Sequence, residues 1–244
     1  MNAYLNDIFK TRKYVKSDGC IIDIHSETGY DQCLFLQEII QKNSFRKSIE
    51  IGFAYGISTL VITDAVTQFG GTHTVIDKFQ NSDWGGVGLD LLAKAGYSEK
   101  LSFFEEYSYK VLPQLLDEGS KYDFAYIDST KQFDWLMVDF FFLDKLIKPG
   151  GVIVFDDVVF PGIRKLLRYL SQLPDYKVYN TYPANGNQQK SRKVNLLGKI
   201  FPFLERYLKE DYLLRDAELG INTHCVALKK TSNDSRNWDW HKSF

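Results

Sequence analysis

Short apolar runs alternate with helical segments along most of this sequence, and this alternation restricts the possible folds more than any other feature. The runs expected as strands lie at residues 48–52, 73–77, 101–104, 122–127 and 151–155. Helical spacing of apolar residues predicts helices at residues 58–68, 86–95, 108–118, 132–146 and 161–172. Such an order of elements favours a parallel sheet with helices on both faces, which is a three-layer α/β/α arrangement.

Further elements are expected on both sides of this alternating part. Apolar residues at helical spacing predict a helix over residues 31–41, inside a helical N-terminal segment of residues 1–45. Apolar and aromatic runs predict a sixth strand at 176–182 and a seventh at 224–230. The expected fold class is therefore α/β, with a Rossmann-like, doubly wound sheet of seven strands.

The stretch between the last two strands, residues 183–221, is long for a connection and contains a helix-like run at 196–214. An insertion of this length is expected to form a lid or an association surface. Residues 232–244 are polar and are expected to form a tail. With 244 residues, 44% of them hydrophobic, the chain can bury one sizeable core, so we expect a single domain over residues 1–244.

The charge and the cysteines restrict the partners and the setting. A formal net charge of −1 argues against a protein that binds nucleic acid through a concentrated basic face. Cys20, Cys33 and Cys225 lack the spacing of a metal site or a disulfide framework, so we expect a reduced, cytoplasmic setting. No apolar run approaches roughly 18 residues, the length of a membrane span, and residues 1–16 lack the apolar core of a secretory signal.

A glycine-bearing turn follows the first predicted strand. Glu50 lies near the strand end, where a buried carboxylate costs free energy unless a partner satisfies it. Gly52 and Gly56 allow backbone angles that other residues avoid, so the backbone can pass close to a ligand. Ser58 is expected to cap the following helix. Together these residues predict a cofactor-binding turn at the carboxyl end of the first parallel strand.

The spacing in this turn differs from that of a dinucleotide site. The pattern is Glu-x-Gly-x-x-x-Gly-x-Ser rather than Gly-x-Gly-x-x-Gly, which favours a ligand without a pyrophosphate. The second predicted strand ends at Asp77, where a carboxylate can accept hydrogen bonds from both hydroxyls of a ribose. On these residues the chain resembles the class I S-adenosylmethionine-dependent methyltransferases.

This resemblance implies S-adenosylmethionine as the cofactor and an antiparallel seventh strand. It implies that Glu50 and Gly52 line the amino acid side of the cofactor and that Asp77 holds its ribose. It also implies that Ser108 and Tyr109 touch the adenine, although Ser108 is equally suited to cap a helix. The implied cofactor-binding set is Glu50, Gly52, Phe53, Ala54, Tyr55, Gly56, Ser58, Asp77, Ser108, Tyr109 and Asp128.

Acidic residues follow the fourth and fifth predicted strands. Asp128 comes directly after residues 122–127, and Asp156 and Asp157 follow residues 151–155. Because adjacent parallel strands place their carboxyl ends side by side, the three carboxylates are expected to converge. Like charges this close are unfavourable unless a cation or a proton neutralises them. Mg²⁺ or another divalent cation with oxygen ligands would suit Asp128, Asp156 and Asp157.

Around these acids the chain resembles the metal-dependent catechol-type and caffeoyl-CoA-type O-methyltransferases. Their acid, their lysine three residues later and their Asp-Asn pair correspond to Asp128, Lys131 and Asp156-Asp157, with Asp in place of Asn. A second resemblance, to bacterial methyltransferases of secondary metabolism and sugar modification, rests on residues 77–80 and 150–157. In that group Lys131 occupies the usual histidine position, which leaves the general base open.

Both resemblances imply methyl transfer to a hydroxyl oxygen of a small molecule. A bound metal would lower the pKa of that hydroxyl, and Lys131, beside Asp128, would accept its proton if the pKa of Lys131 were depressed. His73 and His224 lie in strand-like runs and are expected to be structural.

Three alternatives stay open: a metal-independent methyltransferase of the same fold, a catalytically idle methyltransferase-like binding module, and a nicotinamide-dependent oxidoreductase. The expected partner is a small-molecule acceptor, with no nucleic acid and no membrane, and homodimerisation is left open.

Overall fold

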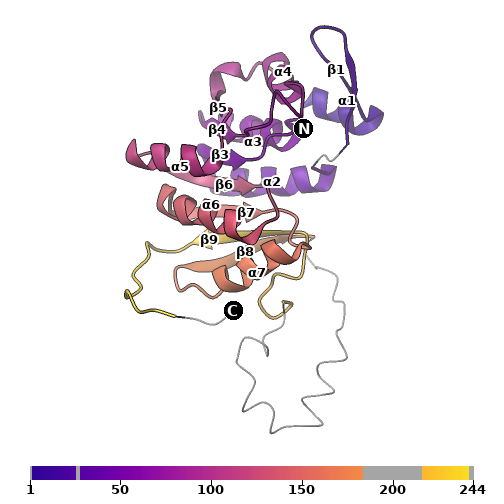
Figure 1. Cartoon of the computed structure of the whole chain (residues 1–244). Coiled ribbons are helices and arrows are strands. Elements are labelled where there is room, and N and C mark those ends of the chain that lie inside the picture. The colour runs from indigo at the N-terminus through magenta and orange to yellow at the C-terminus, as the bar shows by residue number, and fades with distance from the viewer. Residues whose placement is uncertain (1, 26–27, 184–215, 242–244) are drawn as a thin grey trace, which may run out of the picture.

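The computed structural model describes residues 2–25, 28–183 and 216–241 (Figure 1). Within these residues, one sheet contains the strands β3 (Lys47–Ile51), β4 (Thr72–Ile76), β5 (Leu101–Phe104), β6 (Tyr122–Ile127), β7 (Ile147–Phe155), β8 (Tyr176–Tyr182) and β9 (Cys225–Lys230). Their spatial order is β5-β4-β3-β6-β7-β9-β8. β3 to β7 are parallel, and β9 is antiparallel to both of its neighbours. This confirms the predicted seven-stranded sheet and its antiparallel last strand.

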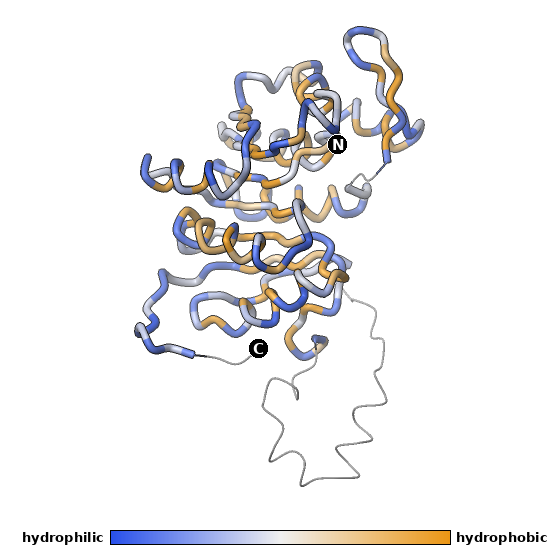
Figure 2. The backbone as a smooth tube through the Cα atoms, in the orientation of Figure 1, coloured by the Kyte–Doolittle hydropathy of each residue, from blue (hydrophilic) through white to orange (hydrophobic). Residues whose placement is uncertain are grey.

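Helices cover both faces of the sheet, as the alternation predicts. They are α2 (Tyr30–Asn43), α3 (Ile57–Thr67), α4 (Val87–Lys94), α5 (Ser108–Asp117), α6 (Phe133–Leu146) and α7 (Pro161–Leu170), with a short 3₁₀ helix at Ser98–Lys100. α2 to α4 share one hydrophobic core with alternate strand residues, and α5 to α7 share a second core with the others. Figure 2 shows hydrophobic stretches concentrated around the sheet, whereas the stretch after β9 is mainly hydrophilic.

The element bounds agree closely with those expected from the sequence. β5, β6 and β8 begin and end at the expected residues. β7 begins earlier than expected, because Ile147 already pairs with Tyr122 before a register shift, after which Val152 pairs with Phe124. The helix-like run expected at 196–214, and most of the insertion around it, lie outside the described residues.

The N-terminal segment contains more structure than the predicted helix. Helix α1 (Ala3–Thr11) buries Leu5 and Ile8, and it is followed by a hairpin of β1 (Lys13–Val15) and β2 (Ile21–Asp23). The hydroxyl of Tyr14 donates a 2.7 Å hydrogen bond to Asp90 of α4, which ties the hairpin to the main domain. Strands of three residues are too short to show a recognisable alternation, so the sequence pattern does not reveal this hairpin.

The carboxyl ends of the parallel strands meet at one edge of the sheet, and this edge positions the site. The turn after β3, the loop after β4 and the residues after β6 and β7 all lie there. Because β9 is antiparallel, its first residues reach the same edge, with Val226 paired to Phe155 at the end of β7. No helix among the described residues combines the length and hydropathy that a membrane span requires.

Candidate active site

The turn between β3 and α3 requires glycine at its first position. Gly52 has φ +99°, and a Cβ atom added there would lie 2.1 Å from the carbonyl oxygen of Asp128. Ala54 also has positive φ, at 45°. The carboxylate of Asp77 accepts hydrogen bonds from the backbone N–H groups of Phe53, at 2.8 Å, and Ala54, at 3.1 Å. Asp77 therefore holds the turn against the end of β4.

Glu50 is buried behind this turn. Its carboxylate accepts hydrogen bonds from Ser58 at 2.5 Å, Thr59 at 2.7 Å and His73 at 3.0 Å. These donors satisfy the charge that the sequence places at the strand end. The expected capping role of Ser58 is wrong, because α3 begins at Ile57 with Gly56 as its N-cap, and the Ser58 hydroxyl turns inward to Glu50.

A cavity of about 440 Å³ opens beside the turn, a size typical of small-molecule sites. Six of the expected cofactor-binding residues line it: Gly52, Phe53, Ala54, Asp77, Ser108 and Asp128. Tyr55, Gly56 and Ser58 line a much smaller neighbouring cavity, together with Gly52 to Ala54 and Asp128. Glu50 is fully buried and is not among the residues that line either cavity.

Tyr109 lies outside the main cavity. It borders a second cavity of about 190 Å³, which shares Ser108, Trp135 and Asp139 with the first. Its neighbour Tyr107 lines the main cavity instead, and the two rings stack with their centroids 5.3 Å apart. Of the two residues predicted for this loop, Ser108 therefore lines the main cavity and Tyr109 does not; Tyr107 lines it instead.

Four aromatic residues in the cavity wall are absent from the predicted set, namely Phe79, Trp84, Tyr107 and Trp135. Trp135 belongs to α6, and its ring centroid lies 6.0 Å from that of Tyr107. Lysine ammonium groups lie over the Tyr107 ring, Lys78 at 5.9 Å and Lys110 at 5.8 Å. These residues come from separate loops and helices, so nothing in their local sequence marks them as neighbours.

Lys131 joins two of the three expected acidic residues. Its ammonium lies 2.8 Å from Asp128 and 2.9 Å from Asp157. Burial acts to lower the pKa of Lys131, but the two carboxylates outweigh it and hold the pKa above its ordinary value. Burial and the nearby Asp156 raise the pKa of Asp128 to about 6, against the opposing effect of Lys131.

Asp156 is surrounded by donors of the protein itself. One carboxylate oxygen accepts hydrogen bonds from Gln32 and from Tyr126, both at 2.7 Å. The other accepts from the N–H of Asp157 at 2.7 Å and from the Cys225 thiol at 3.1 Å. Burial and the charge of Asp156 raise the pKa of Cys225, so its sulfur keeps the proton that it donates. A carboxylate has about four lone-pair sites, and these four donors occupy them.

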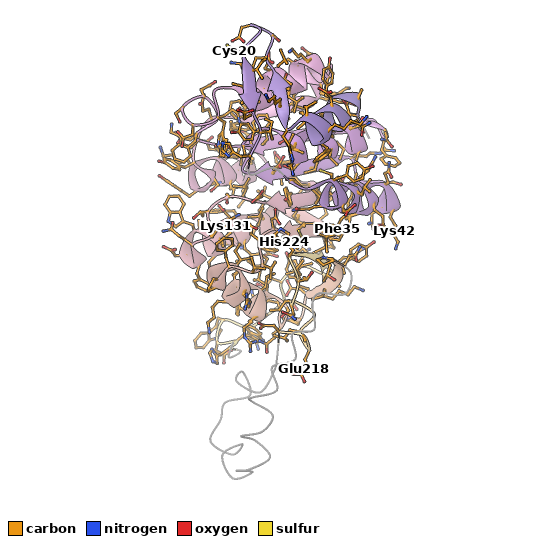
Figure 3. All side chains as sticks on the ribbon, turned by 90° about the vertical axis from the view of Figure 1, so that its right-hand side faces the viewer. Cys20, Phe35, Lys42, Lys131, Glu218 and His224 are labelled. Atoms are coloured by element: carbon orange, nitrogen blue, oxygen red, sulfur yellow. The ribbon has the colours of Figure 1, made fainter. Side chains whose placement is uncertain are left out.

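His224 is a site residue that the sequence reading missed. Its Nε2 atom lies 3.4 Å from Asp156 and 3.7 Å from Asp157, and its side chain is 37% exposed. Figure 3 shows His224 and Lys131 on the same side of the molecule. The strand-like run around His224 points to a structural role, but the antiparallel direction of β9 carries this residue to the functional edge.

A divalent cation fits this arrangement through part of the predicted ligand set. Asp128 and Asp157 present carboxylate oxygens to one position, at which the Lys131 ammonium lies. Such oxygens are suitable ligands for Mg²⁺. Asp156 is engaged by its own donors and would serve to support its neighbours rather than to coordinate the ion.

Comparison with known proteins agrees with this geometry. Residues 49–158 match the family model described as a methyltransferase domain. The chain is 34% identical over 143 residues to tapetum-specific methyltransferase 1 of Arabidopsis thaliana, covering 56% of this chain and 58% of the relative. It is 27% identical over 160 residues to caffeoyl-CoA O-methyltransferase of Populus kitakamiensis, covering 63% and 61%. The chain thus spans less than two thirds of the length of these relatives.

Solved structures show the same fold at low sequence identity. The O-methyltransferase from Bacillus cereus in complex with SAH has a TM-score of 0.60 at 20% identity, covering 73% of this chain and 83% of the other. The O-methyltransferase TomG from Streptomyces achromogenes in complex with SAM has the same TM-score and identity, covering 73% and 82%. Residues 49–158 therefore resemble a methyltransferase domain, and the chain has the Rossmann-like α/β fold of these solved O-methyltransferases.

Proposed function

We propose that this protein transfers a methyl group from S-adenosylmethionine to a hydroxyl oxygen of a small molecule. The observation that carries the proposal is the cavity of about 440 Å³, which joins the glycine turn to Asp77, to the aromatic wall and to Asp128. The names of the relatives support O-methylation, and the solved structures with SAH and SAM support the cofactor.

Asp77 is the residue best placed to hold the ribose. Its carboxylate accepts three backbone hydrogen bonds, from Phe53, Ala54 and Phe79, and so is fixed in orientation. A carboxylate offers about four acceptor sites, so one remains for a ribose hydroxyl. The preorganised turn then aligns the cofactor with its acceptor, which is a major source of rate acceleration.

The reacting methyl group belongs at the Asp128 end of the cavity. Bound S-adenosylmethionine supplies a methyl group on a positively charged sulfur, which an attacking oxygen can take up. The acceptor hydroxyl must lose its proton as it attacks, and the Asp128 carboxylate at this end of the cavity is the group that takes it up. With its pKa raised by Asp128 and Asp157, Lys131 keeps its charge at neutral pH, so the expected role as a base does not suit it in this arrangement. We assign Lys131 instead the role of a charged donor that stabilises the developing oxyanion.

Divalent metal assistance remains part of the proposal. Asp128 and Asp157 are the residues that would hold the ion, and a bound ion would lower the pKa of an acceptor hydroxyl. The metal-independent alternative is favoured by one specific observation, namely that the Lys131 ammonium already bridges these two carboxylates.

Two measurements test the proposed function. Calorimetric titration is expected to show binding of S-adenosylmethionine and none of NAD, whereas binding of NAD alone would support the oxidoreductase alternative. Methyl transfer to a panel of small hydroxylated acceptors is expected to fall in excess chelator and to return with Mg²⁺. Unchanged transfer in chelator would rule out metal assistance and leave Lys131 as the source of positive charge. Cofactor binding without transfer to any acceptor would support the idle binding module.

We also propose a reduced, cytoplasmic setting, because all three cysteines are free thiols and Cys33 and Cys225 are buried. A homodimer is proposed on the exposed apolar side chains of α6, where Val138 is 40% and Phe141 is 52% exposed. Light scattering on the purified chain tests this state, and a monomeric mass at working concentration would contradict it.

A further inference from the structure

Asp139 is a buried carboxylate at the edge of the cavity to which the proposed reaction gives no role. It lies on α6, is only 2% exposed, and borders both the main cavity and the smaller one beside it. Trp135 precedes it by four residues, which places both side chains on the same face of the helix. A carboxylate in such a position costs free energy unless a donor reaches it.

Ser108 is the side chain placed against Asp139. Burial raises the pKa of Asp139 to about 6, and a hydrogen bond from the Ser108 side chain only partly opposes this effect. At pH 7.5 the carboxyl group is therefore mostly ionised and accepts hydrogen bonds. Ser108 is itself 8% exposed and also borders both cavities. The pair therefore presents acceptor capacity to the cavity.

The other residues that line the main cavity indicate what meets this pair. Asp77 and Asp128 both line this cavity. In the proposed function Asp77, with its remaining acceptor site, holds the ribose, and the methyl group is transferred beside Asp128. With the methyl group placed at Asp128, the base attached to the ribose would lie against Tyr107 and Trp135, which line the same cavity as Asp139. Aromatic side chains suit the faces of a purine ring, and a polar group at the edge distinguishes one purine from another.

We propose that Asp139, oriented by Ser108, accepts a hydrogen bond from the exocyclic amine of adenine and makes the site selective for 6-aminopurines over 6-oxopurines. This inference rests on the proposed use of S-adenosylmethionine. An amine donates to the carboxylate, whereas the oxygen of a 6-oxopurine would face it with no proton to share. Sites with a buried polar group reject ligands that leave that group unpaired.

Asn at position 139 offers both an acceptor and a donor in nearly the same volume. The Asp139→Asn variant should therefore tolerate either purine edge. The matched control is Asp134→Asn, since Asp134 lies on the same helix but borders only the smaller cavity. Thermal melting of both variants verifies that they fold.

The experiment is calorimetric titration of the full chain with S-adenosylhomocysteine, its 6-oxo analogue S-inosylhomocysteine, and the 6-deamino analogue. The wild type and Asp134→Asn should prefer the adenosyl compound over the inosyl compound by about 10- to 100-fold, the range for a hydrogen bond to a charged group. In Asp139→Asn this ratio should fall to within about 3-fold, chiefly because the inosyl compound binds more tightly.

An Asp139→Asn variant that keeps the wild-type ratio, or that loses affinity for all three compounds by the same factor, would show that Asp139 only supports the start of α5. Either result overturns this inference and leaves the proposed function standing. A wild type that binds none of the three compounds overturns both.

Discussion

At the scale of single residues, the site depends on which charges are neighbours. Lys131 lies between Asp128 and Asp157, whereas Asp156 has four donors of its own. The convergence of these residues at one edge of the sheet was predictable from strand ends and spacing. Which carboxylate pairs with Lys131 and which is held by other donors was not predictable, because it depends on Gln32, which lies far away in the chain.

Replacing Lys131 tests its proposed role. We expect Lys131→Met to lower the rate of methyl transfer by about 100-fold or more, the range found when a donor to a developing oxyanion is removed. The affinity for S-adenosylhomocysteine should change little, because Lys131 is not among the residues that line the main cavity. Single-turnover transfer and calorimetry measure the two quantities, and a parallel loss of both would contradict the assignment.

A second prediction at this scale is that Asp139 makes the stability of the protein depend on pH. The pKa of Asp139 is raised from 3.8 to about 6 in the folded protein, so the folded state binds a proton between these values that the unfolded state does not. This contribution therefore stabilises the protein as the pH falls through 6 and disappears as the pH rises. Relative to Asp139→Asn, the wild type should gain about 1 kcal/mol of unfolding free energy between pH 7.5 and pH 5. Urea unfolding at the two pH values measures this, and an equal change in both proteins would contradict it.

At the scale of elements, the turn between β3 and α3 places two structural requirements on Gly52, one on its backbone angle and one on the space around it. Gly52 needs positive φ, and it also approaches the backbone of Asp128 too closely for any side chain. The approach is possible because β3 and β6 are adjacent in the sheet, with Ile51 paired to Ile127. The turn and the end of β6 are therefore one structural unit.

Alanine substitutions separate the two requirements. Gly119 also has positive φ, 74°, but a Cβ added there would meet nothing within 4 Å. Gly119→Ala should cost only the backbone strain, about 1–3 kcal/mol, without changing cofactor affinity. Gly52→Ala should cost more and should also weaken S-adenosylhomocysteine binding, because the turn must move away from Asp128. Equal effects of the two changes on melting temperature and on binding would contradict this account.

The success of the element predictions has a physical basis. β6 is a buried strand of the parallel sheet, and its apolar run with polar boundaries defines it locally. The hairpin of β1 and β2 depends instead on Tyr14 reaching Asp90 of α4, a contact 76 residues apart. The aromatic wall of the cavity is likewise assembled from three separate segments. Local sequence determines the first kind of feature and contains little information about the second.

At the scale of the whole molecule, a cluster of three buried polar side chains joins β8 and β9, at one end of the sheet, to α6. Lys230 of β9 is 2% exposed, and its ammonium lies 3.1 Å from the carboxylate of Asp144. The hydroxyl of Tyr176, on β8, donates to the same carboxylate at 2.9 Å. This cluster links the last two strands to the helix that borders the active site.

Removing one partner of this pair should destabilise the entire domain. Lys230→Met leaves Asp144 buried without its cation, which we expect to cost about 3–5 kcal/mol of unfolding free energy. Lys229→Met is the matched control, since Lys229 is partly exposed and hydrogen-bonds Asn43 instead; its cost should stay below about 1 kcal/mol. Urea unfolding compares the two variants, and similar losses of unfolding free energy would show that the buried pair contributes no more than the partly exposed contact of Lys229.

The position of β9 between β7 and β8 has a consequence for biosynthesis. Translation produces β8 first, yet β8 can join the sheet only after β9 has been made and has entered beside β7. His224 and Cys225 arrive with β9, so a nascent chain of fewer than 224 residues lacks two neighbours of Asp156. The ribosome therefore releases the glycine turn well before these last parts of the site, and a product that ends before β9 would carry the turn without His224 and Cys225 beside Asp156.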